Sequence, residues 1–411
     1  MRRRRWLLVV GAAMALTATL GEPAAGDAEA AAALDAALAA SLDEHGVRGA
    51  SLAVVQDWEL VHVTAVGEAE PGRQVEPDTL FQAASLSKPV SASVAAAAAQ
   101  RGLVDLDVDV TTMLTRWRLP PHDEGGDVTC RLLFAQRGGV NVGGFPGYRL
   151  DEPLARFPRL LDGVVGKNEP IRVTDEPGDY RYSGGGYLIA QLAIEDTTGA
   201  RWATLATELV FQQLGMEEST FVVLGAHHRS DVAVGHRSDG AEVAGGGWHR
   251  YPEIAPASLW TTAEEYARFT LDTMRSYQLD DGVVLGRDAA RSMLDPERAM
   301  GFSVIDHRDR VEWRHLGANE GYRSGVVAHP HRGDAIVLLS NGDDGLDVFA
   351  DVEDTAIEVL GWPEPPSGGG SMPWPTVVLA VGSIAVTCAA VLRRRRRAAS
   401  RRRGLTTGPP G

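Results

Sequence analysis

The sequence predicts an α/β protein of the α+β type, in which an antiparallel sheet is built from both ends of one domain and helices lie between them. Residues 50–55 and 60–67 alternate between apolar and polar side chains around the turn at 56–58, a pattern typical of a β-hairpin. From residue 300 onward the period-two alternation returns, whereas the residues between have the longer period of helices. Strands at both ends with helices between them imply one sheet and a helical insertion.

The individual elements follow from periodicity and from end signals. Alanine and leucine at 31–44 predict an amphipathic helix, and the alanine-rich run at 89–100 has the composition of a buried helix, with Pro89 suited to its first turn. Thr261 or Thr262 provides the N-terminal cap of a helix that extends to residue 277. Further helices are expected at 128–136, 186–198, 201–214 and 347–360, and further strands at 301–305, 311–315, 322–328 and 335–340.

The beginning of the chain has the composition of a targeting segment. Residues 2–5 are arginines, an apolar run follows at 6–20, and small residues continue to residue 30. The apolar run is too short for a comfortable membrane span, so a secretory signal peptide at 1–30, cleaved near Ala25 or Ala30, is the better interpretation.

The end of the chain carries a second membrane signal. Residues 376–392 contain no charged residue and reach the lower length limit for a membrane-spanning helix, and eight arginines follow within the tail at 393–411. Positive residues stay on the cytoplasmic side of a membrane. We therefore expect a folded domain at 31–362 outside the cytoplasm, a flexible linker at 363–375, a transmembrane helix and a cytoplasmic tail. A nucleic-acid-binding tail is the weaker alternative.

The arginines at both ends mask a strongly acidic domain. Residues 31–375 hold 28 basic and 52 acidic residues, a net charge of −24. The electrostatic field of a domain with this negative charge repels polyanions, so we expect no nucleic-acid partner. Cys130 lies in the domain and Cys388 in the predicted span, so they cannot pair and the fold contains no disulfide.

The stretch that indicates catalysis is Ser85-Leu86-Ser87-Lys88, at the start of the alanine-rich helix. The chain has 40 Lys+Arg residues, yet only Lys88 and Lys167 are lysines. Three residues apart on a helix, the Ser85 hydroxyl and the Lys88 amine share one face. An amine kept neutral by burial can take the hydroxyl proton, which an arginine cannot do. The four-residue pattern also arises by chance, so its interpretation depends on two further stretches.

The second stretch is centred on Tyr182. It follows the turn 177–179, and the three glycines at 184–186 place the tyrosine in a loop and allow a ligand to approach the backbone. A tyrosine hydroxyl near a lysine amine can share or relay a proton, with its pKa lowered by the cation. The alternative is a core tyrosine beside the start of a helix.

The third stretch, from His315 to Tyr322, lies at the end of a predicted strand. A strand edge that contains Gly317 can offer unpaired N–H groups to a substrate carbonyl, and His315 can donate a hydrogen bond from its ring.

With Ser85-Leu86-Ser87-Lys88, Tyr182-Ser183-Gly184 and His315-Leu316-Gly317 in this order, the chain resembles the serine β-lactamase-related family of class C β-lactamases, D-alanyl-D-alanine peptidases and similar esterases. The resemblance covers roughly residues 31–363. It implies the β-lactamase/transpeptidase fold: an antiparallel sheet flanked by the terminal helices, an all-helical lobe, and the active site between them.

The resemblance also implies the role of each site residue. Ser85 forms the acyl-enzyme, Lys88 and Tyr182 share the base role, and Tyr182 later activates water. The N–H groups of Ser85 and Ala318 form the oxyanion hole, and His315 and Gly317 contribute to substrate binding. No cofactor or metal is expected, because His227, His228 and His236 lack the spacing of a metal site.

Three departures from the family pattern bear on the substrate. Gly184 stands where the second motif usually has asparagine, His315 replaces a lysine, and Ala135-Gln136-Arg137 stands where relatives often have His-Thr-Ser. They favour an esterase or a D-amino-acid peptidase-like hydrolase over an efficient β-lactamase. Arg137 or Arg323 is a candidate for binding a substrate carboxylate. The expected partners are a small-molecule or peptide substrate, including cell-wall fragments, and the membrane.

A function from a different class remains open at this stage. A penicillin-binding-like domain on a membrane stalk could sense wall fragments without turning them over. The single predicted span, the basic tail and the departures at Gly184 and Ala135 favour such a receptor, whereas a purely binding protein has no need of a Ser–Lys–Tyr set.

Overall fold

The structure, a computed structural model, describes residues 25–123, 125–307 and 310–363. The predicted linker beyond residue 363, the transmembrane helix at 376–392 and the tail at 393–411 lie outside these residues, as does most of the predicted signal peptide. Residues 25–30 of that segment form the first turns of a helix. Within the described ranges, no helix combines the length and the apolar character needed to cross a membrane.

The helical elements are, in chain order, α1 (Ala25–His45), η1 (Ala84–Leu86), α2 (Ser87–Gln100), η2 (Val110–Thr112), α3 (Cys130–Phe134), η3 (Arg159–Asp162), α4 (Gly184–Thr198), α5 (Trp202–Ala206), η4 (Thr207–Phe211), α6 (Gln212–Leu214), η5 (Ala226–His228), α7 (Ile254–Ala257), α8 (Ala263–Gln278), α9 (Arg287–Met293) and α10 (Gly345–Val359). The strands are β1 (Gly49–Gln56), β2 (Glu59–Glu70), β3 (Arg73–Gln74), β4 (Phe81–Gln82), β5 (Trp260–Thr261), β6 (Ser303–His307), β7 (Arg310–Asn319), β8 (Tyr322–His329) and β9 (Asp334–Ser340).

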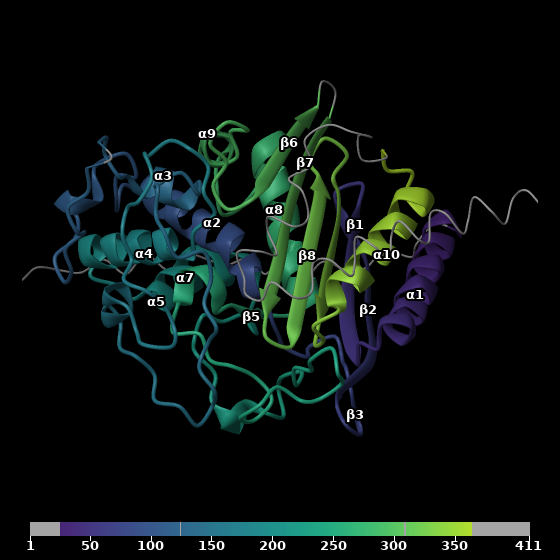
Figure 1. Cartoon of the computed structure of the whole chain (residues 1–411). Helices are drawn as coiled ribbons and strands as arrows, with labels where there is room; N and C mark the ends of the chain where they lie inside the picture. The colour runs from purple at the N-terminus through teal and green to yellow at the C-terminus, as the bar shows by residue number, and fades with distance from the viewer. Residues whose placement is uncertain (1–24, 124, 308–309, 364–411) are drawn as a thin grey trace, which may run out of the picture.

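A seven-stranded sheet contains the strands from both ends of the domain in the order β3-β2-β1-β9-β8-β7-β6 (Figure 1). Each neighbouring pair is antiparallel, and the two ends of the chain meet where β1 pairs with β9, from Ala50 opposite Ser340 to Val55 opposite Ala335. The prediction of an antiparallel sheet built from both ends is confirmed. The helices α2 to α7 form a lobe at one side of the sheet (Figure 1).

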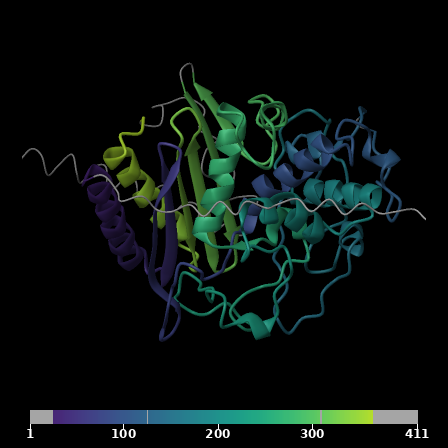
Figure 2. The same ribbon diagram turned by 180° about the vertical axis from the view of Figure 1, so that it is seen from behind.

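Helices cover both faces of the sheet. On one face α1 and α10 lie side by side, and Leu34, Leu38 and Leu42 of α1 recur at every fourth position and are buried there. Gly325 of β8 allows α10 to come close, because a β-carbon at this position would lie 2.7 Å from the ring of Phe349. The opposite face is covered by α8, which packs against β1 and β9 (Figure 2).

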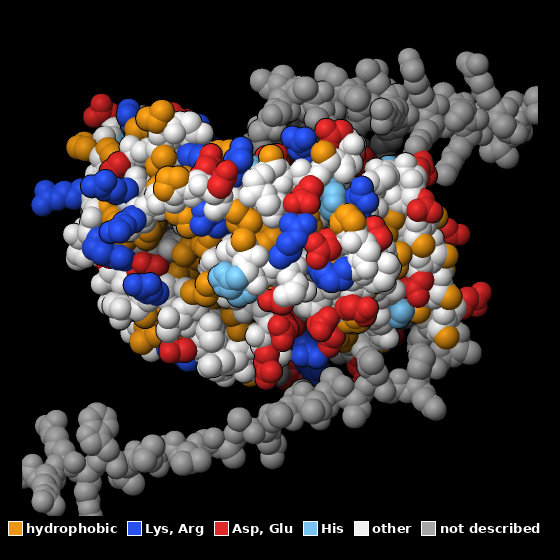
Figure 3. Space-filling view, turned by 90° about the horizontal axis from the view of Figure 1, so that it is seen from below, with side chains coloured by type: hydrophobic (Ala, Val, Ile, Leu, Met, Phe, Trp, Pro, Cys, Tyr) orange, Lys and Arg blue, Asp and Glu red, His pale blue; other side chains and the backbone are white. Residues whose placement is uncertain are grey.

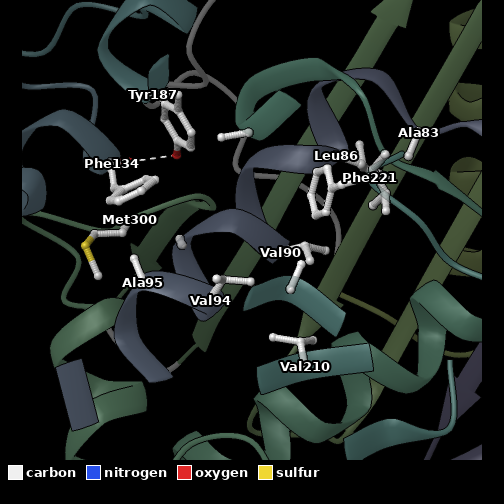
Figure 4. Close-up of a cluster of buried hydrophobic side chains, with 14 of the residues drawn as sticks. Ala83, Leu86, Val90, Val94, Ala95, Phe134, Tyr187, Val210, Phe221 and Met300 are labelled. Carbon is white, nitrogen blue, oxygen red and sulfur yellow. Dashed lines mark hydrogen bonds between the residues drawn. The ribbon is translucent and has the colours of Figure 1, made fainter. Parts of the chain in front are cut away.

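The helix α2 runs through the interior of the helical lobe. All its residues from Ser87 to Ala98 are buried, and Val90, Val94 and Ala95 point into a cluster with Phe134, Val210 and Met300 (Figure 4). Small side chains let its neighbours approach from every direction. This packing fixes the position of the segment that begins with Ser85.

Two elements differ from their expected form. Ser85 lies in the short 3-10 helix η1, and α2 begins only at Ser87. The segment expected as one helix at 201–214 is divided into α5, a π-helical turn and α6.

The surface carries charges of both signs. In the view of Figure 3, acidic side chains occur over much of the face, and lysine and arginine side chains gather towards one side of it. The acidic groups on this face are in line with the net negative charge of the domain.

Candidate active site

The nucleophile is presented on a strained turn between β4 and α2. Ala84, immediately before Ser85, has a φ of +49°, a conformation that costs a non-glycine residue on the order of 1 kcal/mol or more. The carbonyl of Ala83 accepts hydrogen bonds from the Leu86 N–H at 3.0 Å and from the Ser324 hydroxyl of β8 at 2.8 Å. The sheet therefore holds the turn from one side.

The segment after α7 and the helix α8 also hold this turn. The Ser87 hydroxyl donates to the Ala84 carbonyl at 2.6 Å and accepts the N–H of Leu259 at 3.0 Å. The Tyr266 hydroxyl of α8 donates to the Leu86 carbonyl at 3.0 Å. Ser87 was a free position in the sequence motif, and Tyr266 and Ser324 have no local signal at all, so sequence analysis missed these three.

Lys88 lies one turn after Ser85, as the spacing predicted, with its Nζ 3.0 Å from Ser85 Oγ. The amine also donates to the carbonyl of Pro256 in α7 at 3.0 Å. Only 2% of the residue is exposed, and burial lowers the pKa of Lys88 from 10.5 to about 7. A neutral amine that donates to Pro256 keeps a lone pair that can accept the Ser85 proton.

Tyr182 reaches the same oxygen from the loop before α4. Its hydroxyl donates to Ser85 Oγ at 2.9 Å. The loop is held by Gln136, whose side-chain oxygen accepts the Ser183 N–H at 2.6 Å and whose carbonyl accepts the Arg181 N–H at 2.7 Å. The Ser183 hydroxyl caps α4 by accepting the N–H of Gly186 at 3.0 Å. The departure from the family pattern at Gln136 thus supplies the contact that positions Tyr182.

The expectation that a cation lowers the pKa of Tyr182 was wrong. Burial raises the pKa of Tyr182 to about 12, and its hydrogen bond to Ser85 offsets only part of that effect. Lys88 Nζ lies 4.8 Å from the centre of the tyrosine ring, but this amine loses its own proton near pH 7 and is not a permanent charge. At neutral pH the phenol is a donor and the amine is the group able to accept a proton.

The third stretch forms the part of β7 that extends beyond its pairing with β6. β6 pairs with residues 310–314 only, whereas residues 315–319 are paired on the β8 side. Ala318 lines the same pocket as Ser85, so the backbone of this edge and the nucleophile face one space. Gly317 serves close packing, because a β-carbon there would lie 2.6 Å from the Ala83 carbonyl oxygen and 2.1 Å from Ser324 Oγ.

His315 is buried beside the catalytic pair and is uncharged. Burial, followed by the nearby Lys88, lowers the pKa of His315 to about 3. Its Nδ1 lies 2.8 Å from the carbonyl of Leu316, so the neutral ring donates from that nitrogen. Its Nε2 then has only a lone pair, and the expected donation from the ring to a substrate requires the other tautomer.

A narrow pocket opens over Ser85. It is lined by Ser85, Lys88, Gly143, Gly144, Phe145, Gly184, Pro256, Ala257, Ala318 and Asn319. The Asn319 amide donates to Gln82 at 2.7 Å and to the Ala257 carbonyl at 3.2 Å, which joins the edge of β7 to β4 and α7. Asn319 lies two residues after the His315-Leu316-Gly317 motif, and this proximity was the one available signal for its position at the site.

The two arginines considered for substrate binding differ in their contacts. Arg323 forms an ion pair with Asp343 at 2.9 Å and donates to the Asn319 carbonyl. Arg137 donates to the Gly178 carbonyl at 2.7 Å, in the loop before Tyr182.

The histidines at 227, 228 and 236 do not form a group with metal-ligand geometry. Within the described ranges, the group whose ligand atoms approach closely enough is Glu44, His45 and Asp351, between α1 and α10.

The arrangement is suited to nucleophilic attack on a carbonyl. Tyr182 donates to Ser85, and the buried amine of Lys88 can take the hydroxyl proton as the oxygen attacks. Backbone N–H groups at η1 and at the edge of β7 are the available partners for a developing oxyanion.

Comparison with known proteins agrees with this geometry. A family model described as Beta-lactamase matches residues 34–360. Penicillin-binding protein 4 of Amycolatopsis lactamdurans is 28% identical over 340 residues, which cover 75% of this chain and 84% of that protein. Esterase EstB of Burkholderia gladioli is 32% identical over 209 residues, which cover 47% of this chain and only 52% of the esterase.

Solved structures share the fold. The D-amino acid amidase of Ochrobactrum anthropi SV3 is similar with a TM-score of 0.63 at 21% identity, over 81% of this chain and 98% of the amidase. Members of the matched family are serine hydrolases, including esterases, amidases, carboxypeptidases and β-lactamases. Because the family model spans most of the sequence, from the first helix to the last, the chain belongs to the beta-lactamase family.

Proposed function

We propose that the chain is a serine hydrolase that forms an acyl-enzyme on Ser85 with ester or D-amino-acid peptide-like amide substrates. The observation that carries this proposal is the position of Ser85 Oγ, 2.9 Å from the Tyr182 hydroxyl and 3.0 Å from an amine whose pKa burial lowers to about 7. Among the residues that the structure describes, no acidic side chain pairs with Lys88; a buried lysine of this kind costs stability, and this cost is explained if the amine acts as a base.

Ser85, Lys88 and Tyr182 are the side chains that the proposed reaction uses. Ser85 Oγ forms a bond to the substrate carbonyl carbon while its proton passes to Lys88 Nζ. The tetrahedral oxyanion collapses, the bond to the leaving group breaks, and Lys88 returns the proton to the leaving oxygen or nitrogen. Water then attacks the acyl carbon and gives a proton to the same amine, the bond from that carbon to Ser85 Oγ breaks, and Lys88 returns the proton to Oγ as the acid leaves. Tyr182 donates to Ser85 Oγ and stabilises negative charge there in both steps.

Several features favour neutral substrates over anionic ones. His315 has no charge at neutral pH, and Arg323 is paired with Asp343, so neither supplies a free cation for a substrate carboxylate. The similarity to an esterase and to a D-amino acid amidase is compatible with either an ester or an amide.

A fluorophosphonate probe tests the chemistry directly. The protein should be labelled at Ser85, identified by peptide mass spectrometry, and Ser85→Ala should abolish labelling. Ser230→Ala, which removes an exposed hydroxyl, is the matched control and should label normally. Equal labelling of Ser85→Ala and the unmodified protein would refute the mechanism.

A substrate screen then separates catalysis from binding. It compares p-nitrophenyl esters, D-Ala-D-Ala peptides and a chromogenic cephalosporin. Cephalosporin turnover far above the other two would refute the proposed substrate class. A stable acyl-enzyme without turnover of any substrate would instead favour the non-catalytic receptor.

We also propose that the domain acts outside the cytoplasm, tethered by the segment at 376–392. The arginines that flank both apolar segments support this orientation. Protease added to intact cells should release a soluble, active domain and leave the arginine-rich tail protected. If the domain is accessible only after lysis, the site is cytoplasmic and wall peptides are not its substrates.

A further inference from the structure

The helix α7 is a single turn whose last carbonyl groups point out of the helix. It spans Ile254–Ala257, and the backbone bond that caps it runs from the Ser258 N–H to the Ile254 carbonyl at 3.2 Å. The last carbonyls of a helix have no partner within it, and buried ones need a donor from elsewhere. In α7 the carbonyls of residues 255 to 257 each accept a side-chain donor from another element.

Two of these donors come from one face of α2. Ser91 Oγ donates to the Ala255 carbonyl at 2.7 Å. Lys88 lies three residues earlier on the same face, and its Nζ donates to the Pro256 carbonyl at 3.0 Å. The carbonyl that follows accepts Asn319 Nδ2 of β7 at 3.2 Å. The carbonyl that the catalytic amine contacts is therefore flanked by two carbonyls that other side chains hold in place.

Gln191 of α4 holds the same turn through its N–H side. Its Oε1 accepts the Ala255 N–H at 3.1 Å, and its Nε2 donates to Glu195 Oε1 at 3.0 Å. Because a carboxylate accepts hydrogen bonds, Glu195 determines which end of the amide faces α7, and Arg116 holds this carboxylate at 2.8 Å. Ser91 is fully buried and Gln191 is 1% exposed, so water does not compete for either bond.

The position of the Pro256 carbonyl determines where the lone pair of Lys88 points. A neutral amine has two N–H bonds and one lone pair at fixed angles, so an N–H bond given to one acceptor orients the lone pair. Lys88 Nζ lies 3.0 Å from the Pro256 carbonyl oxygen and 3.0 Å from Ser85 Oγ. A displacement of α7 therefore turns the lone pair away from the Ser85 hydroxyl.

We propose that Ser91 and Gln191 are positioning residues for the general base: they hold α7 so that the Pro256 carbonyl orients the Lys88 amine towards Ser85. The inference rests on the proposed function of Ser85 and Lys88, and it adds two residues that do not touch the reacting atoms. A misplacement of about 1 Å in an active site lowers a rate by about a hundredfold, so losing one of the two supports should lower it by about tenfold.

The second-order rate of fluorophosphonate labelling between pH 5.5 and 9.5 tests this role, because labelling requires attack by Ser85 and no later step. Ser91→Ala should lower the limiting rate at high pH by about tenfold. The midpoint of the profile should fall by about half a pH unit or more, since the ammonium form loses its acceptor at Pro256. Gln191→Met should act in the same direction, and the two changes together should be less than additive because they release the same turn.

Most titratable neighbours of the Lys88 amine keep their charge across this pH range. The rings of Tyr182 and Tyr187 lie 4.8 and 5.6 Å from Nζ, and burial raises both pKa values, that of Tyr182 to about 12. Burial lowers the pKa of His315 to about 3. Glu253, next to α7, is the exception, because burial raises its pKa to about 8. In a Glu253→Gln background the serine substitution should therefore cause the same shift of the midpoint.

Ser93→Ala is the matched control. Ser93 lies on the same helix and is 1% exposed, but its hydroxyl lies 3.5 Å from Met293 Sδ and does not contact α7. Its removal should leave the limiting rate and the midpoint unchanged, whatever its effect on the melting temperature. An equal shift of the midpoint in Ser93→Ala would indicate a general loosening of α2 and would overturn the proposal.

The labelling experiment also separates this inference from the function on which it rests. A midpoint that does not move, with labelling rates within twofold of the unmodified protein in both Ser91→Ala and Gln191→Met, would overturn the positioning role and leave the hydrolase proposal intact. If Ser91→Ala does not fold, Gln191→Met decides the question from the other side of α7. Failure to label Ser85 in the unmodified protein would overturn both.

Discussion

Replacing the catalytic lysine should make the protein inactive and more stable. Lys88→Met keeps a side chain of similar length and removes the amine. At neutral pH the unfolded chain holds a proton on Lys88, whereas half of the folded molecules have lost it, because burial lowers the pKa from 10.5 to about 7. The free energy of unfolding of the unmodified protein is therefore lowered by the cost of Lys88 burial, a cost that the variant does not have.

The size of this penalty follows from the pKa difference. Each pKa unit is worth about 1.4 kcal/mol, so the penalty is on the order of 5 kcal/mol at pH 7 and below. The variant leaves the Pro256 carbonyl without its donor, which costs about 1–3 kcal/mol. The net gain from Lys88→Met at pH 6.5 is thus about 2–4 kcal/mol.

The stability difference between Lys88→Met and the unmodified protein depends on pH. Between pH 7 and pH 10.5 the unfolded chain binds more protons than the folded protein, so the stability of the unmodified protein rises with pH through this window. At pH 9.5 the remaining penalty is about 1.4 kcal/mol, and the variant should be no more stable than the unmodified protein. Urea unfolding at pH 6.5 and pH 9.5 measures the change.

The chain offers a matched control in its other lysine. Lys167→Met removes a partly exposed amine that pairs with Glu152 at 2.6 Å, and it should lower stability slightly without such a reversal. If Lys88→Met is less stable than the unmodified protein by the same amount at both pH values, burial does not hold the amine neutral and the assignment of the base is wrong.

The remaining predictions concern the site and one buried acid. The kcat/KM for a p-nitrophenyl ester should rise with pH through a midpoint near 7, since only the neutral Lys88 accepts a proton; a profile flat from pH 5.5 to 8.5 would contradict this. Tyr182→Phe should lower kcat by about a hundredfold or more, with an unchanged melting temperature, because Ser85 loses a donated hydrogen bond; the check is steady-state kinetics beside calorimetry. Glu253 is buried, and its pKa is raised from 4.5 to about 8, so the folded protein keeps a proton that the unfolded chain releases above pH 4.5. Glu253→Gln should therefore raise stability by about 3 kcal/mol at pH 7 and by almost nothing at pH 4.5, as urea unfolding will show. Ser324→Ala should cost about 1–3 kcal/mol and slow fluorophosphonate labelling, because it removes a donor from the Ala83 carbonyl; an unchanged labelling rate would mean that the turn keeps its form without β8.

Much of the fold was predictable because its signals are local. The hairpin of β1 and β2, the strands from β6 to β9 and the cap of α8 at Thr262 depend on patterns within a few residues. The spacing of Ser85 and Lys88 likewise requires only one helical turn.

The parts that escaped prediction depend on contacts between distant segments. Gln136 positions the Tyr182 loop across more than forty residues, and Ser324 supports the nucleophile turn from another strand. The pKa of Tyr182 was misjudged for a related reason: burial of the phenol itself, which raises its pKa, comes from packing that the sequence does not show.

The sheet's order of strands has a consequence for biosynthesis. Strand β1 pairs with β9, with Ala50 opposite Ser340. β1 is therefore synthesised early, whereas its partner is among the last segments of the domain to leave the ribosome. Pairing between such distant segments is slow to form, because a long loop must first be closed. Until then the β1–β2 hairpin exposes an unpaired edge, a feature that promotes association between chains. The nascent domain therefore cannot complete its sheet before nearly all of its sequence has been translated.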